Sequence, residues 1–188
     1  MRNNIIISIF LLLLVGCSST TAKNLYIFSM PTEPPMKYES MGMTIGVEQV
    51  IIPKYLARRE ISLVKNSNQL LLLKNAIWAE NLDVELTSHL INFLQKKFQQ
   101  PAVYLYPWDA SHSKGVTVEL RITRYITQNK QLYLDASWEV NSLTNDKRVI
   151  KLFSIVVATN PTAEAIVNAM DQAFRQLEEE IAKSIHQF

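Results

Sequence analysis

The chain has 188 residues, a formal net charge of +2, one cysteine and four glycines. This length favours one domain with a core large enough to be stable without disulfides. A single cysteine excludes an intramolecular disulfide and a cysteine-based zinc cluster. Four glycines, at positions 16, 42, 46 and 115, cannot form a dinucleotide-binding fingerprint. The near-neutral charge gives no electrostatic reason to expect a nucleic-acid partner.

The N-terminus has the pattern of a secretory signal. Arg2 precedes residues 5–15, an eleven-residue stretch in which only Ser8 is polar. As a helix this stretch would be about 16 Å long, roughly half of a bilayer core. The pattern therefore predicts a signal-peptide hydrophobic region within residues 1–16 and not a membrane span.

The residues after this stretch resemble the bacterial lipobox. Leu14-Val15-Gly16-Cys17 places a small residue directly before the only cysteine. This resemblance implies cleavage between Gly16 and Cys17, a diacylglycerol on the sulfur and an N-acyl chain, such as palmitate, on the new amine. Three acyl chains give near-permanent anchoring, since one chain alone binds membranes only marginally. Ser18, in place of an aspartate, resembles lipoproteins sorted to the outer membrane.

The chain after the anchor begins with a short polar tether, residues 17–23, and continues as a predicted single domain, residues 24–188. Branched and aromatic residues predict a first strand over 23–29, and three prolines predict a loop over 30–43. A strand follows over 44–52 and stops at Pro53, and further apolar runs predict a hairpin, 61–64 with 69–73.

The first predicted helix begins at a cap on Asn75 and runs for about six turns. It carries an apolar stripe at spacings of three and four: Trp78, Leu82, Leu86, Leu90, Phe93, Leu94 and Phe98. A short edge strand is predicted over 103–106, between two prolines.

Three longer strands and a second helix complete the domain. Alternation over 116–122 and 132–140, with an apolar run over 149–157, predicts an antiparallel meander. Thr162 is a predicted cap for the last helix, whose apolar stripe extends to Ile185. The expected fold class is therefore α+β: two layers, with a mainly antiparallel sheet and two long amphipathic helices packed on one face.

Catalytic and metal-binding motifs are not found in the sequence. The three histidines, His89, His112 and His186, do not lie at ligand spacing from one another, and no metal site is predicted at them. The acidic run of residues 178–180 is interpreted as a solvated helix face, opposite the apolar stripe. The sequence therefore predicts no catalytic residue, no metal site and no cofactor other than the lipid on Cys17.

Two groups of residues are candidate partner contacts. Tyr106 and Trp108 flank a proline on a predicted loop, where aromatics favour a protein or membrane contact, with packing on the core as the alternative. Arg58 and Arg59 beside Tyr55 are a candidate docking patch, although a solvated turn is the favoured interpretation.

The order of these features resembles one family. After the lipobox come a strand and a Pro-rich loop, the sequence 45–56 (IGVEQVIIPKYL), a hairpin, the sequence 77–82 (IWAENL) and a C-terminal helix containing 165–170 (AIVNAM). Together they resemble the ABC-type transport auxiliary lipoproteins of the paraquat-inducible protein C type. The resemblance covers nearly the whole chain after Cys17.

The resemblance implies a non-enzymatic accessory of lipid transport between membranes. Such lipoproteins are anchored in the outer membrane, face the periplasm and work with MCE-domain proteins that span it, contributing to envelope integrity. The resemblance also implies a homo-oligomeric ring.

Two other function classes remain open. One is a tethered module that itself binds a lipid or another hydrophobic ligand. The other, less favoured, is an envelope hydrolase, for which the sequence offers no identifiable nucleophile and base.

Overall fold

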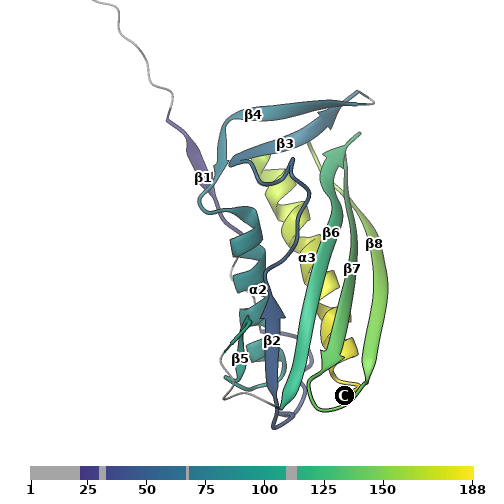
Figure 1. Cartoon of the computed structure of the whole chain (residues 1–188). Helices are drawn as coiled ribbons and strands as arrows, with labels where there is room; N and C mark the ends of the chain where they lie inside the picture. The colour runs from purple at the N-terminus through teal and green to yellow at the C-terminus, as the bar shows by residue number, and fades with distance from the viewer. Residues whose placement is uncertain (1–21, 30–32, 67, 109–113) are drawn as a thin grey trace, which may run out of the picture.

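The computed structural model describes residues 22–29, 33–66, 68–108 and 114–188. These residues form eight strands in one sheet and two helices that lie on the same side of it (Figure 1). Gly16, Cys17 and the predicted cleavage between them lie outside the described residues.

The longest strands form the predicted meander. Strands β6 (Gly115–Gln128), β7 (Gln131–Ser142) and β8 (Arg148–Ala158) pair antiparallel in sequence order. Every second residue of β7 from Leu132 to Val140 is buried, and the residues that alternate with them are partly exposed. The alternation in the sequence therefore predicted correctly which face of the meander packs on the core.

The rest of the sheet is mixed, which corrects the expectation of a mainly antiparallel sheet. β6 pairs parallel with two strands, β2 (Thr44–Glu48) and β3 (Glu60–Lys65). β2 also pairs parallel with β5 (Val103–Tyr106). At the other end of the sheet, β1 (Asn24–Tyr26) pairs parallel with β4 (Gln69–Trp78). Only β3 with β4 adds an antiparallel pair. A helix between β4 and β5 allows β5 to return parallel to β2, whereas residue alternation carries no information on strand direction.

Helix α2 spans Leu82–Lys97 and is shorter than predicted. The predicted start at Asn75 is wrong: Asn75 lies inside β4 with φ of 64°, and Trp78 is the last residue of that strand. Trp78 pairs there with Tyr26 of β1, a partner distant in sequence. The helix starts after Asn81, and Leu82, Leu86, Leu90 and Leu94 form its buried stripe.

Helix α3 spans Ala163–Ile185 and begins where the sequence predicted. The Thr162 hydroxyl accepts a hydrogen bond from the Ala165 amide at 3.3 Å, which caps the first turn. Phe174, Leu177 and Ile181 are completely buried against the meander. Neither this helix nor any other in the described ranges is long and apolar enough to span a membrane.

Candidate functional site

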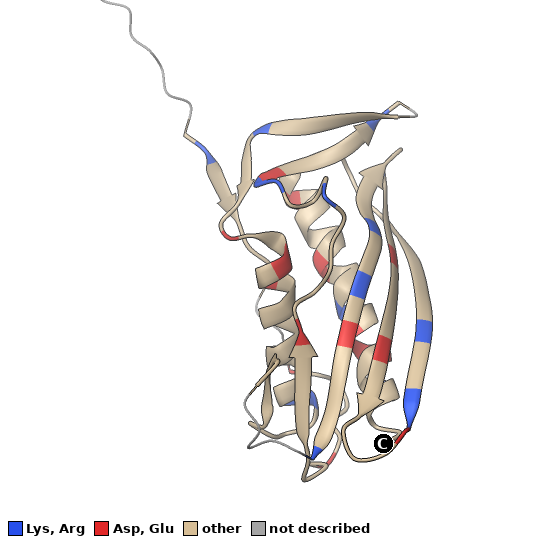
Figure 2. Ribbon diagram, in the orientation of Figure 1, with Lys and Arg blue, Asp and Glu red and all other residues tan. Residues whose placement is uncertain are grey.

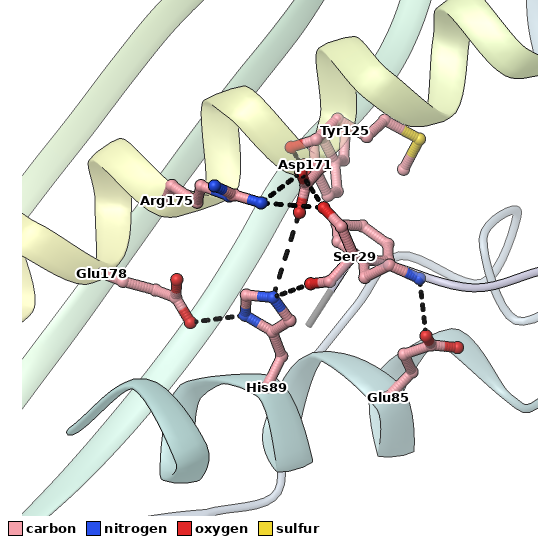
Figure 3. A network of polar contacts seen from close by, with 9 residues as sticks. Ser29, Glu85, His89, Tyr125, Asp171, Arg175 and Glu178 are labelled. Atoms are coloured by element: carbon pink, nitrogen blue, oxygen red, sulfur yellow. Dashed lines mark hydrogen bonds and ion pairs between the residues drawn. The ribbon is translucent and has the colours of Figure 1, made fainter. Parts of the chain in front are cut away.

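A network of polar contacts lies where the N-terminal segment, residues 22–29, meets both helices (Figure 3). The Phe28 amide donates to Glu85 Oε1 of α2 at 2.7 Å. The next residue, Ser29, contacts His89 of α2 through its carbonyl and Asp171 of α3 through its hydroxyl. We call Ser29, Glu85, His89, Asp171, Arg175 and Glu178 the N-terminal clamp.

A buried histidine and a buried glutamate form the centre of the clamp. His89 Nδ1 lies 2.8 Å from Glu178 Oε1, and His89 Nε2 lies 2.8 Å from the Ser29 carbonyl oxygen. The His89 side chain is 5% exposed and that of Glu178 is completely buried. Since the Ser29 carbonyl can only accept, Nε2 carries a proton. His89 therefore links α3 to the N-terminal segment.

Asp171 and Arg175 complete the clamp on the solvent side. Asp171 Oδ2 accepts from the Ser29 hydroxyl and from Arg175 Nη2, the latter at 2.9 Å. Arg175 Nη2 also lies 2.8 Å from Ser29 Oγ. Because Asp171 and Arg175 are one turn apart on α3, one ion pair of that helix holds the Ser29 side chain.

Burial sets the proton affinity of the central pair. It raises the pKa of the Glu178 carboxyl to about 7, although the hydrogen bond and the charge of His89 act to lower it. Burial acts to lower the pKa of His89, but the hydrogen bond and charge of Glu178, the Ser29 carbonyl and Asp171 together raise it above its ordinary value. Both groups therefore hold protons to a higher pH than in the unfolded chain.

Aromatic packing around Phe28 also holds the N-terminal segment in place. Phe28 is 3% exposed, stacks on Trp78 at a centroid distance of 5.5 Å and meets His89 and Phe174 edge-on. Next to the clamp, the Tyr125 hydroxyl of β6 donates to the Met170 carbonyl, and burial raises the pKa of Tyr125 well above its ordinary value. The N-terminal segment is thus joined to β4, α2 and α3.

The clamp does not have the geometry of a hydrolytic site. In a serine–histidine hydrolase the histidine contacts the serine hydroxyl, but here His89 contacts the Ser29 carbonyl, and the Ser29 hydroxyl lies between Asp171 and Arg175. Within the described ranges, no group of three His, Cys, Asp or Glu side chains could hold a metal ion. The arrangement can hold the segment that leads to Cys17 in a fixed position, because it binds this segment to both α2 and α3.

The sequence interpretation missed this cluster and misplaced Glu178. Glu178 is completely buried, so its assignment to the solvated helix face is wrong, whereas Glu179 and Glu180 are partly exposed. Spacing could have indicated its position, because Glu178 follows Phe174 by four residues and precedes Ile181 by three. His89 similarly follows Leu86 by three residues and precedes Phe93 by four on the buried face of α2.

The first group of candidate contacts lies between β2 and β3. The Tyr55 hydroxyl accepts from the Tyr125 amide at 3.2 Å, and the half-buried ring packs on the core. Arg59 donates to the Trp78 and Ala79 carbonyls, each at 3.2 Å. Arg58 is exposed. Tyr55 and Arg59 therefore have structural contacts within the chain, while their exposed atoms and Arg58 remain candidates for docking.

The second group, Tyr106 and Trp108, lies at the end of β5, the strand that pairs with β2 on the edge opposite β6. The two rings meet at a centroid distance of 5.2 Å with an interplanar angle of 89°, and both are partly exposed. A Cβ atom on Gly46 would lie 2.4 Å from Trp108 Cζ3, so the indole covers this glycine. Trp108 thus packs on the sheet, and the structure does not bring it together with the Arg58 group in one patch.

Two surface grooves are candidate sites for a small ligand. One groove of about 490 Å³ runs along α3 and is lined by four apolar residues, Pro34, Pro35, Phe93 and Phe153, and by six polar or charged ones. A second groove, of about 440 Å³, lies beside Phe28 and His89 and contains Glu80 and Glu85. Both grooves expose more apolar than polar surface, but they are open to solvent and do not enclose a ligand.

Comparisons with known proteins place the fold. Residues 26–182 match the model of the family described as ABC-type transport auxiliary lipoprotein component. A crystal structure of an uncharacterized protein superposes with a TM-score of 0.67 and 21% identity, covering 88% of this chain and 99% of that one. The protein XCC0632 from Xanthomonas campestris gives a TM-score of 0.70 and 12% identity, covering 85% and 92% of the two chains. No curated protein sequence gives a significant match.

The contact between Gly46 and Trp108 can be tested by substitution. We expect Gly46→Ala to displace the indole and shift its fluorescence emission to longer wavelength, because the new methyl group would overlap it. In a Trp108→Ala background, Gly46→Ala should cost little unfolding free energy, measured by urea denaturation in a double-mutant cycle. Equal costs in both backgrounds would contradict this contact.

The raised proton affinity of the clamp predicts a pH dependence of stability. Native Glu178 and His89 keep protons that the unfolded chain releases, so the native state binds more protons above the ordinary glutamate pKa. The free energy of unfolding should therefore fall as the pH rises from about 5 to about 8, by on the order of 2 kcal/mol. Urea denaturation across this range measures it.

The matched variants for this measurement are on the same helix. Glu178→Gln removes one titrating group and should flatten the pH dependence, whereas Glu164→Gln, at an exposed position in the first turn of α3, should leave it unchanged. A stability that rises with pH over this range would mean that the native state binds fewer protons than the unfolded chain, as with a neutral native His89, and would contradict the raised proton affinity of the clamp.

The aromatic attachment of the N-terminal segment predicts unequal effects at neighbouring positions. Phe28→Ala should lower the free energy of unfolding by about 3–5 kcal/mol, because it leaves a cavity beneath Trp78 and Phe174. Ile27→Ala, at a side chain 61% exposed, should change it by less than about 0.5 kcal/mol. Similar small losses for both would mean that the segment is not fixed to the fold as described.

Proposed function

Because this chain belongs to the ABC-type transport auxiliary lipoprotein family, we propose that it is an outer-membrane-anchored accessory of an MCE-type system that moves lipids between membranes. In this proposal Cys17 carries a diacylglycerol and an N-acyl chain after cleavage next to Gly16, and the domain faces the periplasm. The partner is a periplasm-spanning MCE-domain protein, and several copies of the chain form a ring that docks on it.

The N-terminal clamp is the observation that carries this proposal. Only eleven residues separate Cys17 from Ser29, where the chain is already bound to α2 and α3. A lipid on Cys17 would therefore hold a fixed end of the domain near the membrane and leave the other end free for a partner. A non-enzymatic role agrees with the hydrogen bonds of the clamp, which tie Ser29 to Asp171 and the Ser29 carbonyl to His89.

The alternative of a ligand-binding module receives less support. The groove along α3 has four apolar and six polar or charged lining residues, and the smaller groove contains two glutamates. A storage site for acyl chains is expected to enclose most of its ligand, whereas both grooves are open to solvent. This exposure to solvent favours a docking role over lipid storage, and the hydrolase alternative has no serine hydroxyl on a histidine in the clamp.

The lipid anchor can be tested in cells. Cys17→Ser should abolish palmitate incorporation and move the protein from the outer-membrane fraction to another fraction, because this cysteine is the only acceptor of the lipid. Ser18→Ala is the matched control and should keep both the palmitate and the membrane fraction.

The partner is tested with the wild-type protein. Crosslinking in intact membranes followed by co-purification should capture an MCE-domain protein, and the mass of the purified assembly should be a multiple of the protomer. A strict monomer that captures no such partner would overturn the docking role, even if Cys17 carries lipid.

A further inference from the structure

The charge of the molecule is divided unequally between its two ends. Residues 22–29 and 53–78, which hold β1, the loop after Pro53 and the β3–β4 hairpin, contain six basic side chains and one acidic one, a net charge of +5. Residues 17–188 as a whole carry 18 basic and 17 acidic side chains, net +1, so the remainder carries −4. We call residues 22–29 and 53–78 the basic end.

The structure gathers these segments at one end of the molecule. β4 pairs with both β1 and β3, and Arg59 of the preceding loop donates to the carbonyls of Trp78 and Ala79. Figure 2 shows mainly Lys and Arg at this end, whereas Asp and Glu lie along the helices and segments of both charges lie along the meander. All six basic side chains are exposed: Lys23, Lys54, Arg58, Arg59, Lys65 and Lys74.

The outer face of β1 adds exposed apolar side chains to the basic end. Leu25 is 63% exposed and Ile27 61% exposed, while Tyr26 and Phe28 between and beyond them point toward the core. Leu25 pairs in register with Ile77 of β4, so the apolar surface continues onto the neighbouring strand. Exposed Leu and Ile beside exposed lysines are the composition of a surface that lies at a membrane interface.

The tether limits where this surface can be. Five residues lie between Cys17 and Lys23, and a fully extended chain advances about 3.5 Å from one residue to the next, so Lys23 lies within roughly 20 Å of a lipidated Cys17. The described chain begins at residue 22, directly before β1, and β1 lies next to the β3–β4 hairpin (Figure 1). The basic end is therefore the part of the molecule that a membrane anchor at Cys17 brings to the bilayer.

Resting on the proposed lipidation, we propose that the basic end lies on the surface of an anionic phospholipid bilayer, with Leu25 and Ile27 in the interfacial layer. Basic side chains near an anionic surface are attracted to it over about one Debye length, and the attraction weakens with salt. Docked in this way, the domain has a defined orientation, with the β7–β8 turn and the start of β6 directed away from the membrane. An acidic protein partner for the same surface is the competing outcome.

The test uses the full-length, lipidated protein in vesicles. The lipid occupies the only native thiol, so Leu25→Cys provides a single site for an environment-sensitive fluorophore. Leu152→Cys, at an 85% exposed side chain on β8, is the matched control. In vesicles of phosphatidylcholine and phosphatidylglycerol, the label at 25 should emit at shorter wavelength and be quenched by lipid-borne quenchers, and the label at 152 should do neither.

Charge variants separate docking from simple tethering. Lys65→Gln with Lys74→Gln should reduce the quenching at position 25, as should high salt or omission of phosphatidylglycerol. Lys114→Gln with Lys147→Gln removes the same charge at the opposite end and should leave the quenching unchanged. Equal effects of the two double variants would overturn the role of the basic end.

The mass of the N-terminal peptide shows whether Cys17 carries lipid, and this result separates a failure of the inference from a failure of the proposed function. Lipid on Cys17 with a label at 25 that stays in an aqueous environment would overturn this inference and leave the proposed function standing. A label that becomes buried only when a protein partner is added would overturn it in favour of a protein interface. Absence of lipid on Cys17 would overturn the proposed function and this inference together.

Discussion

The hydrogen bond between His89 and Glu178 is the contact on which the arrangement of the N-terminus depends. It joins α2 to α3, and the other nitrogen of the same ring holds the Ser29 carbonyl. Breaking a buried charged pair by removing one partner is strongly destabilising, because the other is left without compensation. One imidazole therefore couples the packing of the helices to the position of the segment that leads to Cys17.

A polar clamp fixes this segment more specifically than apolar packing alone could. Phe28 fills a space between Trp78 and Phe174, and neighbouring registers of a strand could place another apolar side chain there. The amide of Phe28 and the carbonyl and hydroxyl of Ser29 each meet a particular side chain, which defines one register. The proposed function, in which a lipid on Cys17 positions the domain relative to a membrane, requires such a defined attachment.

Patterns within short segments predicted most helices and strands, and the errors arose where a strand pairs with a segment distant in sequence. The meander, the β3–β4 hairpin and the Thr162 cap follow from alternation and capping within short segments. The predicted start of α2 was wrong because Trp78 continues the spacing of the helical stripe, whereas in the structure it pairs in the sheet with Tyr26, 52 residues earlier. The parallel pairs were missed because the direction of a strand depends on where its distant neighbour lies.

The sequence by itself determined the lipobox, the α+β class, the buried faces of β7 and α3 and the family resemblance, because each depends on residues close together in the chain. The tertiary structure alone decided that Glu178 meets His89 across 89 positions, that Trp108 covers Gly46, and that the basic segments share one end. These facts depend on how elements pack against one another. The environment that raises the Glu178 pKa exists only after α2, α3 and the N-terminal segment have come together.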